Sequence, residues 1–298
     1  MGLKEWTSNP EKFKNLLAMP VQILMNLVAM PAFILAWYVA FTNWRPIRGD
    51  WWQADFIFFD NFIRMFSDEY FIGAISRTLF ILVVVVSIEF LIGFGLAYIL
   101  SGDFRGKKVA ITAILLPMMV VPAVGGFIFY LMFLQTGPVN ALISLITGTE
   151  FTLAWFNYPS TALLTIMLTD IWQWTPFMFL IFISSMLALP PDPINAAYVL
   201  GASRAYTFRR VAIPMLRTPI LIAIILRSIE AFKIFDYVYV MTQGGPGYTT
   251  QTISIYLYEF GFKYARFGYV TAQSLLIMVT MGIVAWYASK PLRGAGQT

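Results

Sequence analysis

Long apolar stretches separated by short polar segments run through the whole chain. Six of them reach the length that an α-helix needs to cross a membrane, about 20 residues at a rise of 1.5 Å per residue. They cover residues 21–41, 79–100, 109–134, 162–189, 220–240 and 270–288. The pattern predicts an all-α polytopic membrane protein with six transmembrane helices. The third and fourth stretches exceed the length of a straight span, so we expect these helices to tilt or kink.

The segment ahead of the first apolar stretch, residues 1–19, has its own helix signal. Asn9 followed by Pro10 is typical of an N-cap and a first helical residue, and predicts a short helix along the cytoplasmic membrane surface. The first apolar stretch is longer than the core of a secretory signal and lacks a small-x-small cleavage site at its end. We therefore expect it to be retained as a membrane helix.

Basic residues outside the apolar stretches differ in number between the two sides that alternating spans define. Twelve lie on one side: Lys4, Lys12, Lys14, Arg105, Lys107, Lys108, Arg204, Arg209, Arg210, Arg217, Lys290 and Arg293. Six lie on the other: Arg45, Arg48, Arg64, Arg77, Lys263 and Arg266. Because basic residues favour the cytoplasmic side, both termini are expected in the cytoplasm. Trp44, Trp51, Trp52 and Trp155 fall where an outer aromatic belt is expected.

Composition narrows the classes of function. Of the 298 residues, 59% are hydrophobic and 12% charged, about half the charged share of a soluble domain. A disordered or nucleic-acid-binding chain is excluded. The chain has no His and no Cys, which excludes Ser-His-Asp and Cys-His nucleophiles and zinc sites built from those ligands. With no phosphate-binding GxxxxGK[ST] loop and no long soluble insertion, residues 1–298 are expected to form one membrane domain without a catalytic or metal site.

The segment 190–214, on the expected cytoplasmic side, has an unusual composition. Asp192 and Pro193 suit an N-cap and a first helical position, and predict a short helix. The surface of this helix is expected to carry small side chains that allow another protein to approach closely, namely Ala196, Ala197, Gly201, Ala202 and Ser203. Arginines flank them. The segment is therefore either a docking element for a partner or a plain connection whose basic residues set the topology.

The same segment resembles a known family. Its pattern is similar to the EAA loop of ABC-importer permeases, with matching positions at Asn195, Ala196, Ala197, Gly201, Ala202, Ser203, Arg204, Phe208, Val211, Ile213 and Pro214. A second run over residues 232–247, followed by 249–252 and 267–269, is similar to the carbohydrate branch, which includes the maltose and glycerol-phosphate importers. The family's acidic first position is Asn195 here, and its usual Asp before the glycine is Leu200.

The resemblance implies a transport subunit of the bacterial inner membrane and not an enzyme. Such a permease works with a second permease, here expected to be non-identical, two ATP-binding subunits and an extracytoplasmic solute-binding protein. No cofactor is expected in this chain, since ATP and magnesium bind to the partner ATPase. The resemblance assigns ATPase coupling to Asn195, Ala196, Ala197, Gly201, Ala202, Ser203, Arg204, Phe208 and Pro214.

Ionisable residues inside the apolar stretches are candidates for a functional site, because they are costly in the bilayer unless paired or hydrated. Arg227, Glu230, Lys233 and Asp236 recur every three residues with alternating sign, and neighbours on adjacent turns can pair into a neutral ladder. Glu89 and Asp170 can complete such a network.

The resemblance to the maltose-type importer implies a different role for some of the same positions. It places the substrate pathway at Asp170, Gln173, Trp174, Phe177, Arg227, Glu230, Ala231 and Ile234. Each half of this set recurs with helical spacing and so shares one helix face. An arginine facing such a pathway suits a sugar derivative with a negative group, which makes an acidic solute a hypothesis.

Two other classes of protein compete with an importer. An ion-coupled secondary sugar transporter can use intramembrane charges, but it is expected to show internal repeats, and none is evident. A membrane enzyme needs a nucleophile or metal motif beside Asp170 and Glu230, and the sequence contains none.

Overall fold

The computed structural model describes residues 10–294, and in this range it is almost entirely helical, with one isolated β-bridge between Thr42 and Phe56. The described chain divides into two compact units. One unit comprises the chain up to Ser67 together with Glu259–Val279, and the other comprises Asp68–Tyr258 together with the chain from Thr280. The fold class expected from the sequence, an all-helical polytopic protein, is confirmed.

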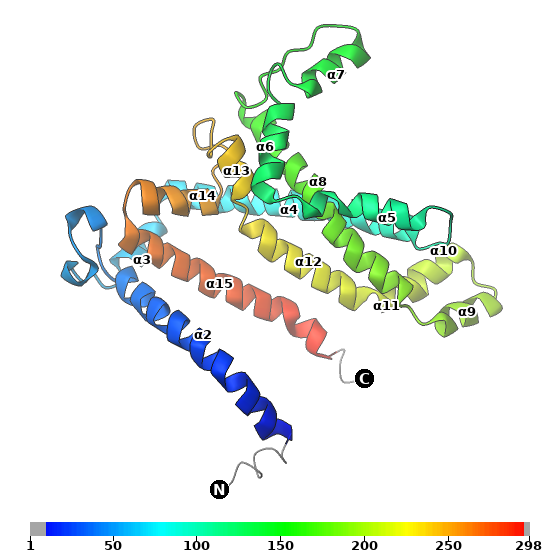
Figure 1. Ribbon diagram of the computed structural model, residues 1–298, viewed down its shortest axis with the longest axis horizontal. Helices are drawn as coiled ribbons and strands as arrows, with labels where there is room; N and C mark the ends of the chain where they lie inside the picture. The colour runs from blue at the N-terminus through cyan, green and yellow to red at the C-terminus, as the bar shows by residue number, and fades with distance from the viewer. Residues whose placement is uncertain (1–9, 295–298) are drawn as a thin grey trace. The chain divides into compact units, whose positions relative to one another are not determined.

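The first unit is built on a long N-terminal helix (Figure 1). Its elements are α2 (Pro10–Ala40), the 3₁₀ turns η1 (Pro46–Arg48) and η2 (Trp51–Gln53), α3 (Asp60–Met65), the π-helical turn η5 (Glu259–Lys263) and the first part of α15 (Phe267–Gly294). Pro10 begins α2 as predicted, whereas the predicted cap, Asn9, lies outside the described residues. The helix continues without a break past Pro20, so the expected surface helix and first span form one helix.

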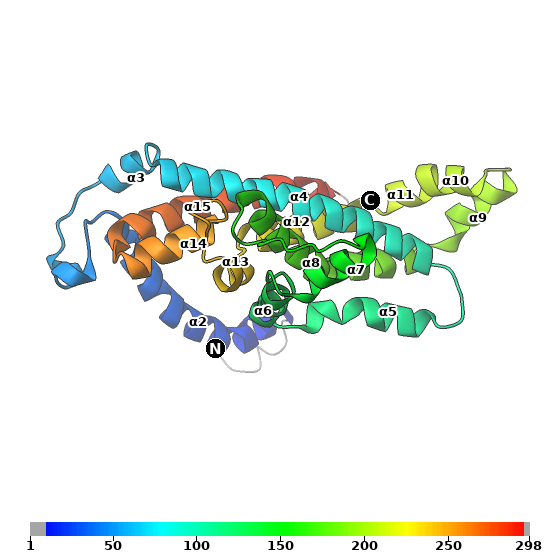
Figure 2. The same cartoon turned by 90° about the horizontal axis from the view of Figure 1, so that it is seen from above.

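The second unit contains most of the helices and the functional candidates. Its elements are α4 (Glu69–Leu100), α5 (Lys107–Leu115), η3 (Pro117–Met119), α6 (Pro122–Met132), α7 (Pro138–Thr147), α8 (Pro159–Leu187), α9 (Pro191–Val199), α10 (Arg204–Thr207), η4 (Phe208–Ala212), α11 (Ile213–Met215), α12 (Arg217–Phe232), α13 (Asp236–Met241), α14 (Ile253–Tyr258) and the last part of α15. Helix α8 packs along α4 and α12, and α13 lies against α6, as Figures 1 and 2 show.

Close packing of α4 against α8 depends on a glycine. A Cβ atom at Gly93 would lie 2.8 Å from Met178 Cβ and 2.9 Å from the backbone nitrogen of Phe179, which is closer than real Cβ atoms approach. Small residues let membrane helices approach closely and gain dispersion contacts. The buried core around this contact includes Ile81, Val85, Phe179, Phe182 and Val238.

Among the described residues, four helices are long and apolar enough to cross a membrane. They are Leu17–Ala40 of α2, all of α4, all of α8, and Phe267–Lys290 of α15. Two bent pairs of helices are also apolar enough, one joining Lys107–Met119 to Pro122–Met132 at 94° and one joining Arg204–Met215 to Arg217–Met241 at 61°. If each bent pair counts as one span, the total is the predicted six.

The kink expected in the third span is present and has a local cause. Val120 and Val121 adopt extended backbone angles between η3 and α6. Pro122 follows them, and a residue before proline is disfavoured in the helical region. The fourth span behaves differently, since α8 runs from Pro159 to Leu187 as one helix despite Pro176 in its interior.

Candidate functional site

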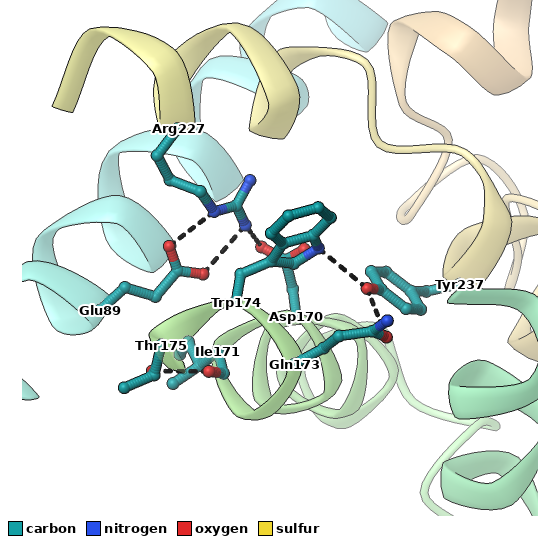
Figure 3. Close-up of polar contacts among 8 residues, drawn as sticks. All are labelled: Glu89, Asp170, Ile171, Gln173, Trp174, Thr175, Arg227 and Tyr237. Atoms are coloured by element: carbon teal, nitrogen blue, oxygen red, sulfur yellow. Dashed lines mark hydrogen bonds and ion pairs between the residues drawn. The ribbon is translucent and has the colours of Figure 1, made fainter. Parts of the chain in front are cut away.

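Three charged side chains from three different helices form a buried cluster in the second unit (Figure 3). Arg227 of α12 donates to Glu89 of α4 through Nε (2.7 Å) and Nη2 (2.9 Å). The Nη2 atom also donates to Asp170 Oδ2 of α8. No side chain of the three is more than 2% exposed. Because charge in the membrane interior is costly unless paired, this cluster fixes α4, α8 and α12 to one another.

A chain of neutral hydrogen bonds lies beside the charged cluster. Tyr237 of α13 donates its hydroxyl proton to Gln173 Oε1 (2.8 Å) and accepts from Trp174 Nε1 (3.0 Å), as Figure 3 shows. Gln173 in turn donates to the backbone carbonyl of Val120 at the break between η3 and α6. The Trp174 ring lies 5.2 Å from the guanidinium carbon of Arg227. The two networks therefore share a cation–π contact.

The structure brings some of the predicted pathway residues together and separates others. Asp170, Gln173, Trp174 and Arg227 belong to the two connected networks. Phe177 packs edge-on against Trp174, with ring centroids 6.1 Å apart.

The remaining predicted pathway residues lie elsewhere. Ala231 and Ile234 are buried in the hydrophobic core. Glu230 pairs with Lys233 (2.8 Å) at an exposed position outside the networks.

The charge ladder expected along the fifth span is present only at the Glu230–Lys233 pair and is wrong in two other respects. Arg227 pairs with Glu89 and Asp170 from neighbouring helices instead of with Glu230, because two buried carboxylates satisfy a buried guanidinium more fully than one exposed group. The helix also ends at Phe232, with Lys233 at its C-cap, so Asp236 starts a new helix and does not continue the face. The expectation that Glu89 and Asp170 complete a network is confirmed.

Tyr237 was not among the predicted residues, although it joins the two halves of the neutral network. The spacing that connects positions 227, 230, 231 and 234 continues to 237 when it is extended by three residues. The helical spacing therefore could have predicted Tyr237 as a member of the site. The residue belongs to α13 and not to α12, so it reaches Gln173 and Trp174 only because the chain breaks between the two helices.

The small-residue segment 190–214 forms α9, a turn, and then the consecutive helical elements α10, η4 and the start of α11. Helix α9 begins at Pro191 after Pro190, so Asp192 lies in the first turn and is not the N-cap that was predicted. Proline at the first position needs no amide partner, which makes a capping side chain less necessary. Asn195, Ala196 and Ala197 lie in α9, with Asn195 and Ala196 exposed.

Gly201, Ala202 and Ser203 lie in the turn after α9 and not on the helix surface that was expected. Gly201 has a φ of +81°, in the left-handed region that favours glycine. The Ser203 hydroxyl caps α10 by accepting from the backbone N–H of Tyr206 (3.3 Å). The glycine thus has a backbone role, since a Cβ atom placed there meets nothing within 4 Å.

One aromatic residue anchors this loop to the membrane helices. The Phe208 ring lies 4.4 Å from the Tyr98 ring and 6.1 Å from the Phe94 ring, centroid to centroid, and both belong to α4. Arg204 and Pro214, on either side of it, are exposed. At the tip of α9, Leu200 is 87% exposed. The loop therefore combines a fixed base on α4 with an exposed apolar tip.

A second loop meets the other end of α4. Arg77 Nε donates to the carbonyl of Gln251 (2.9 Å), and the Thr78 hydroxyl accepts from the N–H of Ile253 (2.8 Å). From Arg77 to Tyr98 the helix advances 21 residues, about 32 Å at 1.5 Å per residue, which is close to the thickness of the hydrocarbon core. The loops 190–214 and 242–253 thus contact α4 at two points separated by the length that a helix needs to cross a membrane.

The described residues offer no metal site. Within 10–294, no group of three or more Asp or Glu side chains is placed to hold an ion, and the sequence has no His or Cys.

Comparison with known proteins identifies the family. A family model described as a binding-protein-dependent transport system inner membrane component matches residues 89–291. The chain belongs to this family. The matched residues include the buried charged cluster, the loop 190–214 and the Gly-rich loop after α13, so the resemblance to ABC-importer permeases is confirmed. The permease is an integral inner-membrane protein.

Similar proteins agree with this assignment. The permease is 33% identical to the probable ABC transporter permease protein y4oQ of Sinorhizobium fredii over 93% of this chain and 89% of the relative. It is 30% identical to the sulfoquinovosyl glycerol transport system permease protein SmoG of Agrobacterium fabrum, over 91% of this chain and 88% of the relative. Its fold matches a chain in the crystal structure of a bacterial alginate ABC transporter in complex with an alginate-bound periplasmic protein, with a TM-score of 0.80 over 98% of both chains at 21% identity.

Proposed function

We propose that this permease is one of two non-identical membrane subunits of an ATP-driven importer that carries a sugar or sugar derivative into the cytoplasm. Two ATP-binding subunits, which hold ATP and magnesium, bind on the cytoplasmic side. An extracytoplasmic solute-binding protein delivers the solute on the other side. The family match supports transport that depends on a binding protein. The relative named for sulfoquinovosyl glycerol supports a sugar derivative as the solute.

The loop 190–214 is the observation that carries the proposal. It offers a short helix with small exposed residues, an exposed apolar tip at Leu200, and arginines that no ion pair among the described residues occupies. A leucine in water favours burial against a partner. We assign this loop to docking on the ATPase, with an apolar contact at Leu200 and a hydrogen bond at Asn195 replacing the family's charge contacts.

The contacts inside the second unit support a mechanical link from this loop to the transport pathway. Phe208 ties the loop to α4, and Glu89 on α4 ties that helix to Arg227 of α12 and Asp170 of α8. Movement of the loop against the ATPase would then move the three helices together. Rigid-body motion of this kind is what alternating access needs.

The basic residues support the orientation. The side that carries the loop 190–214 has twice as many Lys and Arg residues outside the spans as the opposite side. We therefore place both termini and α9 in the cytoplasm, and the loop 242–253 outside.

The networks support a pathway for the solute beside α8. Trp174 and Phe177 are half-buried and present apolar ring faces, which suit the C–H face of a pyranose. Gln173 and Asp170 lie next to them. Arg227 is already paired with two carboxylates, so its presence does not call for a negative charge on the solute.

Co-purification and uptake test the proposal together. The tagged chain is purified from its native membrane in mild detergent, and the proteins that accompany it are identified by mass spectrometry. We expect an ATP-binding subunit and a second six-span chain. Vesicles that contain the complex and its extracytoplasmic solute-binding protein should accumulate labelled sugar only when ATP is supplied. A chain that purifies alone and moves sugar on an ion gradient would contradict the proposal.

A further inference from the structure

Four arginines line one cavity in the first unit, and none of them belongs to the site described above. The cavity has a volume of about 190 Å³, several times the roughly 30 Å³ of one liquid water. We call it the arginine pocket. Its lining consists of Asn43, Arg45, Arg48, Ile57, Asn61, Arg64, Arg266 and Tyr269.

The backbone around the arginine pocket is held in place by hydrogen bonds that close the loop after α2. The N–H of Asn43 donates to the carbonyl of Asp55 (3.1 Å), and the N–H of Ile57 donates to the carbonyl of Phe41 (2.8 Å). The start of α15 joins this loop, since the N–H of Gly268 donates to the carbonyl of Trp44 (3.0 Å). The pocket is therefore a built feature and not a gap in a loose loop.

A buried amide forms part of the lining. Asn61 is 3% exposed, and its Nδ2 donates to the carbonyls of Ala40 and Thr42, at 2.9 Å each. These two bonds fix the start of α3 to the end of α2. Arg64, one turn further along α3, is positioned by this contact and also stacks over Tyr269, with its guanidinium carbon 5.6 Å from the ring centroid.

The positive charge of the pocket has no counter-charge in direct contact. Among the described residues, no ion pair involves Arg45, Arg48, Arg64 or Arg266. Two acids of the loop, Asp50 and Asp55, line an adjoining cavity together with Arg45 and Arg48, and Asp55 accepts from Asn43 Nδ2 (2.9 Å). Four guanidinium groups facing one cavity repel one another, and each is a planar donor suited to an oxyanion.

The pKa of Arg45 shows the effect of placing four arginines close together. Burial lowers the pKa of the Arg45 guanidinium, and the neighbouring charges of Arg48, Arg266 and Arg64 lower that pKa further. An anion in the pocket would relieve the repulsion.

The surroundings of the pocket are apolar and exposed. Residues close in sequence to the lining expose large apolar side chains, namely Ile47 and Trp52 in the loop after α2, and Phe58, Phe59 and Ile63 around the start of α3. Trp and other aromatic residues gather at the level of lipid headgroups. A site for a free ion in water has no need of exposed apolar neighbours, whereas such neighbours suit a ligand that has an anionic head and acyl chains.

We propose that the arginine pocket binds a phosphate oxyanion presented by the headgroup of an anionic phospholipid. The arginines hold the phosphate oxygens through charge-assisted hydrogen bonds, and the exposed aromatic and aliphatic residues contact the chains. This site does not depend on the sugar or on the coupling loop.

Lipid titration of the purified, delipidated complex tests the proposal. Dioctanoyl-phosphatidylglycerol is compared with dioctanoyl-phosphatidylcholine and with inorganic phosphate, and binding is followed by native mass spectrometry and by the midpoint of thermal unfolding. Two variants are tested. One is the double variant Arg45→Gln/Arg266→Gln, and the other is Arg48→Gln, which should not disturb folding because the Arg48 side chain is exposed. Lys263→Gln is the matched control, because Lys263 carries the same charge and does not line the pocket.

We expect phosphatidylglycerol to bind and to raise the midpoint in the wild-type complex and in Lys263→Gln. In the double variant the affinity for phosphatidylglycerol should fall at least about tenfold, the loss expected for one or more charge-assisted hydrogen bonds. In Arg48→Gln the affinity should fall less. Without lipid, the double variant should unfold no earlier than the wild type, because repulsion is removed. Equal stabilisation by inorganic phosphate would contradict the lipid assignment, and lipid binding that is unchanged in all variants would overturn the site.

Discussion

Arg227 and Glu89, 138 positions apart in the sequence, form a two-pronged ion pair in the membrane interior, with N···O distances of 2.7 and 2.9 Å. Both side chains are essentially unexposed, at 1% and 0%. Asp170 binds the same guanidinium from a third helix. One cation thus binds two carboxylates. Removing the arginine should therefore cost more stability than removing either carboxylate.

Replacing Arg227 with Gln should destabilise the permease far more than replacing Glu89 with Gln. The first change leaves two carboxylates buried without a cation, at a cost of about 3–5 kcal/mol in the free energy of unfolding. The second leaves a balanced Arg227–Asp170 pair. Unfolding in mixed micelles with SDS measures the difference, and an equal loss in both variants would refute this account of the cluster.

The uptake of acidic and neutral sugars should respond equally to Arg227→Lys. This variant keeps the positive charge but loses the two-pronged geometry toward Glu89, so it weakens the helix block and not a contact with the solute. Initial rates of ATP-dependent uptake are compared for an acidic sugar and its neutral analogue. A loss confined to the acidic sugar would assign Arg227 to the solute instead.

Gly93 and Gly95 make a matched pair on α4. Gly93→Ala should lower the free energy of unfolding by about 1–3 kcal/mol, because the new methyl group meets Met178 and the backbone of Phe179. Gly95→Ala meets nothing within 4 Å and should be neutral or stabilise the helix slightly. The same SDS titration measures both, and similar effects at the two positions would contradict the close packing of α4 on α8.

Gly201 tests whether the turn after α9 needs a backbone conformation or a small surface. Its φ of +81° costs about 1–2 kcal/mol for alanine, whereas asparagine tolerates this region better. If conformation matters, ATP-dependent uptake should fall in Gly201→Ala and be largely retained in Gly201→Asn. A loss that follows side-chain size, with alanine active and both asparagine and leucine inactive, would instead indicate close contact with a partner.

The sequence predicted the spans and the residues of the site better than it predicted which of those residues pair with one another. Hydrophobic length located each membrane helix, because the bilayer imposes that length directly, although α4 begins at Glu69, ten residues before the start predicted at position 79. Proline and extended valines near position 120 explain the predicted kink of the third span. The pairing of Arg227 was ambiguous, since Glu230 and Asp170 are equally acidic, and only the packing of α4, α8 and α12 decides between them.

In the loop 190–214, too, the sequence identified the residues better than it identified their structural roles. Its residues were sufficient to find the family, whereas the roles of Gly201 and Ser203 were misassigned to a helix surface. A left-handed residue ends α9 before those positions, and the sequence alone leaves open whether a glycine is chosen for its size or for its φ.

Cross-linking from α9 tests the central claim most directly, that this loop couples the permease to an ATPase. The chain has no cysteine, so Ala196→Cys creates a single thiol at an exposed position of the helix. Thr149→Cys, exposed in the loop after α7, serves as the control. In membranes that hold the whole complex, a short thiol cross-linker should join position 196, and not position 149, to the ATP-binding subunit. Failure at position 196, or capture there of the extracytoplasmic binding protein, would contradict the account.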